Sequence, residues 1–169
     1  MKFNKKNLAK SPFNYTGGKY KLLDQLLPLF PDKVDTFYDL FAGGANVAVN
    51  VKAKKIIAND IQHQIIQFLQ ACKNYSSDYI LQKIDNLIDK YNLSKTNAES
   101  YYKLRDYYNK ENRDSIAFYT LTCYAFNHMI RFNRKGEYTY SFGKDRSSFN
   151  PKIGENLINF IDKLKEINI

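Results

Sequence analysis

Two acidic residues and a pair of glycines form the part of this sequence best suited to binding a small ligand. Asp39 lies within a short apolar and aromatic run, Phe37 to Phe41, and Gly43 and Gly44 follow almost at once. Glycines adopt backbone angles that other residues avoid, and their missing side chains let a ligand approach the main chain. A second apolar run, residues 55–58, is followed by Asp60. An acid after the second strand of an open α/β sheet is where such folds bind ribose hydroxyls, so the pattern predicts a nucleoside-containing cofactor between the glycines and Asp60.

These residues need a strand, a turn and a helix to position them. The run 37–41 is typical of a buried strand, and the apolar stretch 45–51 predicts a helix after the glycines. In an open α/β sheet, ligands bind at the carboxyl ends of the strands, where this turn would lie. The simpler alternative is a plain corner between a strand and a helix, without a ligand.

A second glycine-rich segment is Tyr15-Thr16-Gly17-Gly18-Lys19. It stands before a helix that leucine spacing predicts over residues 22–30. Main-chain amides at the start of a helix can bind a carboxylate or a phosphate, and Lys19 would add a charged partner. The segment does not match a Walker loop, because the spacing and the residue after the lysine differ. The alternative is an exposed basic loop.

A third group of polar and basic residues alternates with aromatic residues in a predicted hairpin, residues 131–149, whose turn is residues 134–137. Its members are Asn127, Arg131, Asn133, Arg134, Lys135 and Lys144. Arginine reads guanine and asparagine reads adenine through paired hydrogen bonds in the major groove, whereas lysine contacts phosphates. The alternative is a solvated edge hairpin whose charges discourage aggregation.

Composition limits the class of protein. A chain of 169 residues with 44% hydrophobic residues is one globular domain, or one domain with an insertion. No apolar run is long enough to span a bilayer, and the basic N-terminus has no apolar core of a secretory signal. Cys72 and Cys123 are isolated from each other and from both histidines, which argues against a metal site or a disulfide and predicts a cytoplasmic protein.

The positive charge is clustered at two places. The net charge is +9, and residues 1–21 hold six lysines and no acid, while residues 131–152 hold six basic residues and two acids. Two basic blocks beside a neutral body suggest a polyanion partner, most simply nucleic acid. Between the blocks, apolar spacing predicts a helix that begins near Ile61 and carries Ile61, Ile65, Ile66 and Leu69 on its inner face. It also predicts helices over residues 80–91, 98–109 and 115–127, and a last helix over 154–169.

In this order the three segments resemble the adenine-specific DNA methyltransferases of the Dam type, including restriction–modification methylases. Pro12-Phe13 with the segment 15–19 is similar to their motif Pro-Phe-x-Lys-Trp-x-Gly-Gly-Lys, and residues 39–45 are similar to Glu/Asp-Pro-Phe-x-Gly-x-Gly. Asp60 resembles the acid that holds the cofactor ribose, and residues 127–144 resemble the target-recognition hairpin. The resemblance covers residues 12–152.

This resemblance implies an α/β fold: a partial Rossmann-like methyltransferase sheet with an α-helical target-recognition region and a β-hairpin. Residues 1–72 would begin the S-adenosylmethionine-binding domain, residues 73–152 would form the target-recognition region, and residues 153–169 a return helix. The implied reaction is methyl transfer to the exocyclic amino group of adenine in double-stranded DNA. The implied cofactor-binding residues are Tyr15, Gly17, Gly18, Lys19, Asp39, Phe41, Gly43, Gly44 and Asp60. The six polar and basic residues of the hairpin would contact DNA, with Arg131 in direct base contact.

The sequence departs from the family pattern in four ways. Tyr15 replaces a tryptophan, Leu40 replaces a proline, and residues 139–141 replace Asn-x-Pro. The four prolines are all separate, so the family's catalytic Asp-Pro-Pro-Tyr motif is absent. We therefore expect that this chain has no catalytic residue and is inactive alone. It would be a truncated or split form of the enzyme. Its partner would be a second chain that carries the catalytic half, or it would form a homo-oligomer. The alternative is a non-catalytic DNA-binding or interaction protein derived from a degenerate methylase. Two strands alone are expected to leave an unpaired edge and an exposed apolar face.

Overall fold

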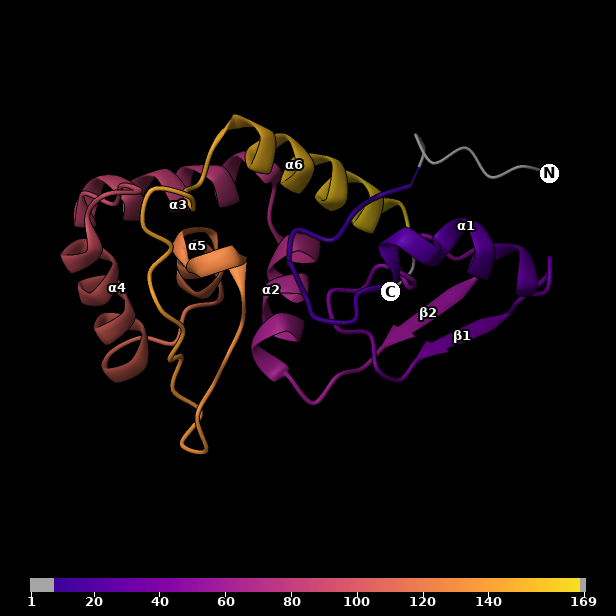
Figure 1. Cartoon of the computed structure of the whole chain (residues 1–169). Coiled ribbons are helices and arrows are strands. Elements are labelled where there is room, and N and C mark those ends of the chain that lie inside the picture. The colour runs from indigo at the N-terminus through magenta and orange to yellow at the C-terminus, as the bar shows by residue number, and fades with distance from the viewer. Residues whose placement is uncertain (1–7, 168–169) are drawn as a thin grey trace.

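The computed structural model describes residues 8–167 in two adjoining parts. We call residues 8–62, which contain two parallel strands, the sheet half, and residues 63–167, which are mostly helical, the helical region. Helix α2 lies between the strands and the other helices, and α6 runs back along one side of the molecule toward the strands (Figure 1). Helix α6 packs against both α2 and α3, and the side chain of its Asn156 donates to the carbonyl of Lys10 at 3.4 Å, which links α6 to the sheet half.

The sheet half is built on β1 (Thr36–Asp39) and β2 (Lys55–Ala58). The strands are parallel, with Asp39 opposite Ala58. The predicted α/β class and the two predicted strands are therefore confirmed. Because the carboxyl ends of parallel strands meet, the turn after β1 and the acid after β2 lie at one edge. Within residues 8–167 the sheet has two strands and no more.

The continuous helix predicted over residues 22–30 is wrong. Three short helical pieces take its place: η2 (Lys19–Leu22), α1 (Leu23–Leu26) and η3 (Leu27–Leu29). Pro28 lies within η3 and has no N–H to continue an α-helix. Leu23 and Leu27 are buried, whereas Leu22 and Leu29 are exposed.

The helix predicted over residues 45–51 is also wrong, because the segment forms successive turns. Ala45 has a left-handed φ of 61°, which interrupts a right-handed helix at its first residue. Alternate valines and two asparagines follow, and both residue types have low helix propensity. The two asparagine side chains bond to a distant backbone segment instead of staying in solvent.

The remaining helices are found as predicted, but the first of them begins at His63 instead of near Ile61, and the Ile61 side chain is exposed instead of lying on an inner face. They are α2 (His63–Asn74), α3 (Ser77–Tyr91), α4 (Ala98–Lys110), α5 (Ser115–Tyr124) and α6 (Pro151–Glu166). Side chains of Ser76, Asn97, Asp114 and Asn150 accept hydrogen bonds from backbone amides in the first turns of α3 to α6. Helix α5 ends three residues earlier than predicted, where Ala125 is extended and Asn127 and His128 have positive φ.

Helix α5 forms the centre of the core, and every one of its residues except Ser115 is buried. Tyr119 on α5 stacks on Phe68 of α2 with ring centroids 4.5 Å apart. Phe13 from the sheet half reaches this cluster, with its ring 5.2 Å from Phe68 and 5.6 Å from Phe118. One aromatic core therefore joins the N-terminal segment to the helical region.

The predicted hairpin is confirmed as an antiparallel loop, but it contains no extended strand. Single antiparallel bridges join Phe132 to Tyr138 and Ala125 to Phe142. The short turn η4 (Phe126–His128) precedes the loop, and the predicted turn, residues 134–137, lies at its tip. Among the residues that the structure describes, no helix is both long and apolar enough to cross a bilayer.

Candidate cofactor site and nucleic-acid interface

Asp60 closes the turn that follows β1. One carboxylate oxygen accepts the Gly43 N–H at 2.8 Å, and the other accepts the Gln62 N–H at 2.9 Å. The backbone of Asn59 also accepts the Ala42 N–H at 2.9 Å. The glycines and Asp60 are thus brought together at the carboxyl ends of the strands.

The Asp60 carboxylate fits the role of a ribose acceptor. Each carboxylate oxygen can accept two hydrogen bonds, and the two amides use one position on each oxygen. Capacity for two further donors remains, which matches the two hydroxyl groups of a ribose.

Tyr15 completes this group of residues. A Cβ added to Gly43, which has a φ of 50°, would lie 2.9 Å from Cδ1 of Tyr15, so the tyrosine ring packs directly on Gly43. Burial raises the pKa of Tyr15, and the negative charge of Asp60 raises it further. The aromatic ring, the glycine turn and the acid therefore share one site, although they come from three segments of the chain.

The space left by the glycines is filled by side chains of this chain. A Cβ on Gly44 would lie 2.2 Å from Oγ of Ser11, while the ring of Tyr15 covers Gly43. The close approach that the glycines permit is therefore made by residues 11–15, which form one wall of the candidate site.

Asn46 and Asn50 hold this N-terminal segment in place. The Ser11 N–H donates to Oδ1 of Asn46 at 2.9 Å. Asn50 bonds Ala9 twice, accepting its N–H at 2.9 Å and donating to its carbonyl at 2.8 Å. Residues 9–15 are referred to below as the strap. Sequence reasoning missed both asparagines, and their spacing of four residues in an otherwise apolar stretch is the only local signal for them.

Asp39 stabilises the turn that follows β1. Its carboxylate accepts the Ala48 N–H at 3.2 Å. Burial raises the pKa of Asp39, the bond from Ala48 lowers it, and the charge of Asp60 raises it again. Asp39 therefore holds the turn, and the partly buried side chain does not project into solvent.

The remaining predicted cofactor residues surround an open site. Lys19 donates to the carbonyl of Gly17 at 2.8 Å, so its ammonium group lies against its own loop. A Cβ on Gly18 would lie 3.0 Å from the carbonyl of Tyr15. A hollow of about 200 Å³ lies beside Tyr15 and Gln62, while the side chain of Phe41 is 89% exposed. The described residues thus enclose only part of a cofactor site.

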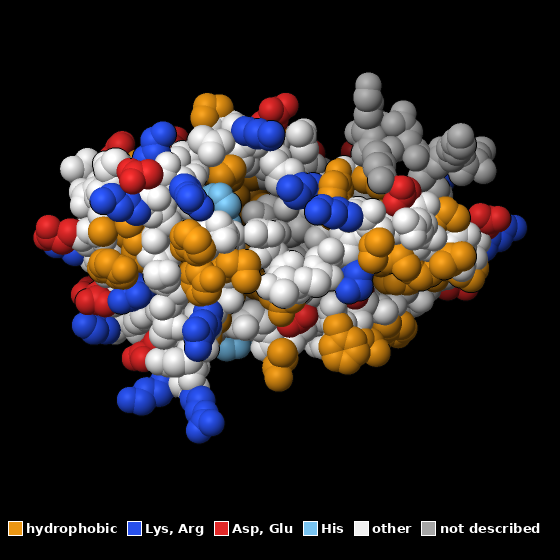
Figure 2. All heavy atoms as spheres, in the orientation of Figure 1, with side chains coloured by type: hydrophobic (Ala, Val, Ile, Leu, Met, Phe, Trp, Pro, Cys, Tyr) orange, Lys and Arg blue, Asp and Glu red, His pale blue; other side chains and the backbone are white. Residues whose placement is uncertain are grey.

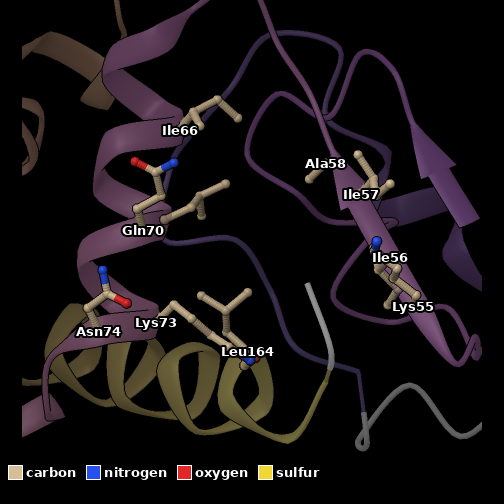
Figure 3. Close-up of a pocket in the computed structure, with 10 residues that line it drawn as sticks. Lys55, Ile56, Ile57, Ala58, Ile66, Gln70, Lys73, Asn74 and Leu164 are labelled. Carbon is tan, nitrogen blue, oxygen red and sulfur yellow. The ribbon is translucent and has the colours of Figure 1, made fainter.

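A separate cavity of about 430 Å³ lies between β2 and the helices α2 and α6 (Figure 3). Ile57, Ile66 and Leu164 line it from three elements. Lys73 connects α2 to the end of α6 by donating to the carbonyl groups of Leu164 and Ile167. The cavity gives β2 an open apolar flank, as expected for a sheet of two strands.

The hairpin presents its basic residues to solvent. All six predicted DNA-contacting residues are exposed: Asn127, Arg131, Asn133, Arg134, Lys135 and Lys144. Basic side chains project at the tip of the hairpin (Figure 2). A hollow of about 450 Å³ between the strap and the start of α6 adds Lys10 and Lys152 to the basic surface.

Two of the predicted DNA-contacting residues form hydrogen bonds within the protein, Asn133 through its side chain and Asn127 through its backbone carbonyl. The side chain of Asn133 accepts the N–H groups of Lys135 and Glu137 at 2.9 Å each and donates to the Glu137 carboxylate at 2.6 Å, so it holds the turn. The carbonyl of Asn127 accepts a hydrogen bond from the Asn14 side chain at 2.8 Å. That bond joins the strap to the hairpin and was not anticipated from the sequence.

The described residues contain no cluster of three or more metal-ligating side chains. The titratable groups near the candidate site are the carboxylates of Asp39 and Asp60 and the phenol of Tyr15. Their arrangement can bind hydroxyl groups and stack on an aromatic ligand.

Comparison of the sequence with known proteins identifies the family of this chain. The sequence model of the D12 class N6 adenine-specific DNA methyltransferases matches residues 15–169. The chain is 48% identical over 160 residues to the Type II methyltransferase M.FokI of Planomicrobium okeanokoites, covering 95% of this chain and 25% of that protein. It is 42% identical over 163 residues to the modification methylase StsI of Streptococcus sanguinis, covering 96% of this chain and 25% of that protein.

A more distant relative is the DNA adenine methylase of Escherichia coli K12, at 28% identity over 162 residues, 94% of this chain and 55% of that protein. The chain therefore spans about a quarter of the length of M.FokI and StsI. Since the family model covers the cofactor segment, the glycine turn, Asp60 and the hairpin together, this chain belongs to the D12 class of N6 adenine-specific DNA methyltransferases.

Proposed function

We propose that this chain binds S-adenosylmethionine and double-stranded DNA and takes part in methyl transfer to the exocyclic amino group of adenine. The observation that carries the proposal is the meeting of Tyr15, Gly43 and Asp60 at the carboxyl ends of two parallel strands. The relatives support the same reaction, since M.FokI is a methyltransferase, StsI is a modification methylase and the Escherichia coli protein is a DNA adenine methylase. In this proposal β1 and β2 are part of a larger Rossmann-like sheet.

Three residues would hold the cofactor, which supplies a methyl group on a sulfonium when bound. Asp60 accepts the ribose hydroxyls, Gly43 holds the Asp60 carboxylate in place through its N–H, and the ring of Tyr15, which packs on Gly43, offers an aromatic face. Phe41 is exposed beside them and adds apolar surface. Lys19, Gly17 and Gly18 shape the loop that carries Tyr15.

The hairpin would bind DNA by its basic residues, with Arg131 contacting a base directly and Lys135 and Lys144 contacting phosphates. The strap-to-hairpin bond between Asn14 and Asn127 supports a DNA surface that lies next to the cofactor site. Lys10 and Lys152, in the hollow beside the strap, would add phosphate contacts.

The methyl transfer itself would need groups that this chain does not contain. The amino group of adenine is a poor nucleophile, because its lone pair is delocalised into the ring. In the family an Asp-Pro-Pro-Tyr segment accepts its hydrogen bonds and stacks on the flipped base. The four separate prolines of this chain exclude such a segment. We therefore propose that activity requires further polypeptide, which would cover β1, β2 and the exposed Phe41.

Calorimetric titration with S-adenosylmethionine tests the cofactor site. Asp60→Asn removes the charge and keeps one acceptor oxygen, which can retain the bond from the Gly43 N–H while the bond from the Gln62 N–H is lost. Losing a charge-assisted bond costs about 1.5–3 kcal/mol, and we expect binding to weaken about ten- to a hundredfold. Asp162→Asn, on the exposed face of α6, is the matched control and should bind as the wild type does. Equal affinity of both variants would remove Asp60 from the site.

A methylation assay tests the reaction. Labelled methyl transfer from S-adenosylmethionine to duplex DNA is measured for the chain alone and with a second polypeptide that carries an Asp-Pro-Pro-Tyr segment of the family. We expect transfer only from the mixture. Turnover by the 169-residue chain alone would show that our account of the catalytic groups is wrong. DNA binding without transfer under either condition would favour the non-catalytic alternative.

A further inference from the structure

One face of helix α4 takes the place of a third strand beside the hairpin. Four residues spaced by four, Tyr101, Arg105, Asn109 and Arg113, each donate to a backbone carbonyl of the hairpin. Three of them lie within α4, and Arg113 lies just beyond its end. We call these four residues the ladder.

The ladder follows the second arm of the hairpin in order. Tyr101 donates its hydroxyl to the carbonyl of Tyr140 at 2.8 Å, and Arg105 donates to the same carbonyl at 3.4 Å. Asn109 donates to the carbonyl of Tyr138 at 3.0 Å and accepts the Tyr138 N–H at 2.8 Å. The guanidinium of Arg113 donates to the carbonyl of Gly136. From Arg105 to Arg113, successive ladder residues thus meet every second residue of the arm, in antiparallel order, and Tyr101 shares the carbonyl of Tyr140 with Arg105.

The rise per residue in the helix and in the arm explains why ladder residues four apart meet arm residues two apart. Four residues of an α-helix rise about 6 Å, and two residues of an extended chain rise about 6.6 Å. The side chain of Asn109 therefore bonds the backbone of Tyr138 as a residue of a neighbouring strand would, with one donor and one acceptor. The amide side chain of asparagine carries the same groups as a peptide unit.

The other edge of the same arm faces the first arm of the hairpin. Thr139 donates its N–H to the carbonyl of Arg131, and the Glu137 carbonyl accepts the N–H of Asn133, both at 3.0 Å. The carbonyl of Ser141 likewise accepts the N–H of Phe126 at 2.9 Å. Odd-numbered residues of the second arm thus bond the first arm, and even-numbered residues bond the ladder, which is the alternation of a central strand.

We propose that the ladder sets the register of the hairpin and so positions Arg131 for reading a DNA sequence. The inference rests on the proposed DNA binding. Arg131 is exposed, but its carbonyl is held by Thr139, whose neighbours Tyr138 and Tyr140 are held by the ladder. Tyr101, Arg105 and Asn109 are therefore positioning residues that affect specificity without touching DNA. Loosening them is expected to blur the placement of Arg131 while leaving the count of phosphate contacts unchanged.

The first test measures the hairpin without DNA, by hydrogen exchange of the Tyr138 and Thr139 amides in the full chain. Asn109→Leu keeps a similar volume and removes both bonds to Tyr138. We expect exchange at these amides to accelerate about ten- to a hundredfold, because a partly buried donor loses its acceptor. Asn112→Leu is the matched control, since Asn112 is three residues away and its side chain donates to the hydroxyl of Tyr107 and not to the hairpin. Unchanged exchange in Asn109→Leu would overturn the ladder.

Tyr101→Phe is a second variant that keeps the core intact. It removes one hydroxyl, while the ring retains its contact with Phe142, at 5.5 Å between centroids. Exchange at Tyr138 and Thr139 should accelerate less than in Asn109→Leu, and thermal melting confirms that each variant is folded.

The second test measures specificity by selecting bound duplexes from a pool of random sequence. For Asn109→Leu we expect the preference for the wild-type protein's selected duplex over the random pool to fall about tenfold, with the same dependence of affinity on salt. The salt dependence counts phosphate contacts, which a general loss of structure would reduce. Faster exchange with unchanged preference would overturn the specificity role. If the wild-type chain selects no sequence, the proposed sequence reading fails together with this role, and the exchange rates still decide whether the ladder holds the hairpin.

Discussion

The helical region and the sheet half differ in how completely they cover their own apolar side chains. In the helical region, the ring of Phe118 is fully buried among Phe13, Phe132 and Tyr138. In the sheet half, Phe41 is 89% exposed and Ile61 is 96% exposed. Apolar side chains gather on the surface near the strands (Figure 2). The helical region, together with Phe13 of the sheet half, therefore covers its aromatic core, whereas the sheet half leaves large apolar side chains exposed near the strands.

The same contrast extends to titratable groups. The buried phenols and thiols whose pKa values are raised most belong to the helical region, among them Tyr108, Tyr119 and Cys123. In the sheet half the raised values belong to Tyr15 and Asp39, at the candidate cofactor site. We therefore expect alkaline pH to lower the stability of the protein mainly through groups of the helical region.

Alkaline pH is expected to have the largest effect. Burial raises the pKa of the Cys72 and Cys123 thiols to about 12, against about 8.5 in an unfolded chain. The folded state therefore keeps protons that the unfolded state loses. Stability is full below about pH 8.5 and falls as pH rises toward 12, by up to about 1.4 kcal/mol per pH unit for each thiol.

Urea unfolding between pH 7 and 11 measures this effect. A Cys72→Ala/Cys123→Ala double variant is the control, since it lacks both thiols and should lose less stability over the same pH range. An identical slope in the two proteins would show that the thiols are not protected as described.

Phe118→Ala should cause the largest single-residue loss. Phe118 is fully buried on α5, and truncating a buried phenylalanine lowers the free energy of unfolding by about 3–5 kcal/mol. Urea denaturation of the purified variant gives the value. A loss below 1 kcal/mol would contradict the view that the aromatic core of the helical region carries the stability.

Two glycine substitutions should act in opposite directions in the two parts. A Cβ at Gly44 would meet Ser11 at 2.2 Å, so Gly44→Ala is expected to displace the strap and cost about 1–3 kcal/mol. At Gly154, in α6, an added Cβ would come no closer than 3.5 Å to a neighbour. Gly154→Ala should stabilise the protein by about 0.5–1 kcal/mol.

Thermal melting of both alanine variants provides the measurement. Adding Ser11→Gly to Gly44→Ala removes the clashing atoms and should recover part of the loss, as expected for coupled neighbours. A loss of stability in both Gly44→Ala and Gly154→Ala would contradict the prediction that only the variant beside the strap is destabilised.

Phe41→Ser should have the smallest effect on stability. Its side chain is 89% exposed, and substitutions at such positions usually change stability by less than about 0.5 kcal/mol. Binding of an apolar fluorescent dye should decrease, because the exposed patch near the strands becomes smaller. A large loss of stability would mean that Phe41 packs against residues of this chain, against the contrast drawn above.

Local pattern alone determined a substantial part of this structure. The apolar spacing of residues 80–91 and 98–109 predicted α3 and α4, and two short apolar runs predicted β1 and β2. Because parallel strands align their carboxyl ends, the meeting of Gly43 with Asp60 followed from the same pattern. The exposure of the basic hairpin also agreed with its composition.

Only the tertiary structure decided how the irregular segments are held. Tyr15 packs on Gly43, Asn50 bonds Ala9 across 41 positions, and Asn109 bonds Tyr138 across 29 positions. Long-range bonds from Asn46 and Asn50 stand where a helix over residues 45–51 was predicted. Hydrophobic periodicity describes which face of a segment is buried, but it does not specify which distant backbone group a polar side chain will meet. Those partners exist only once the strap, the turn and α4 have packed together.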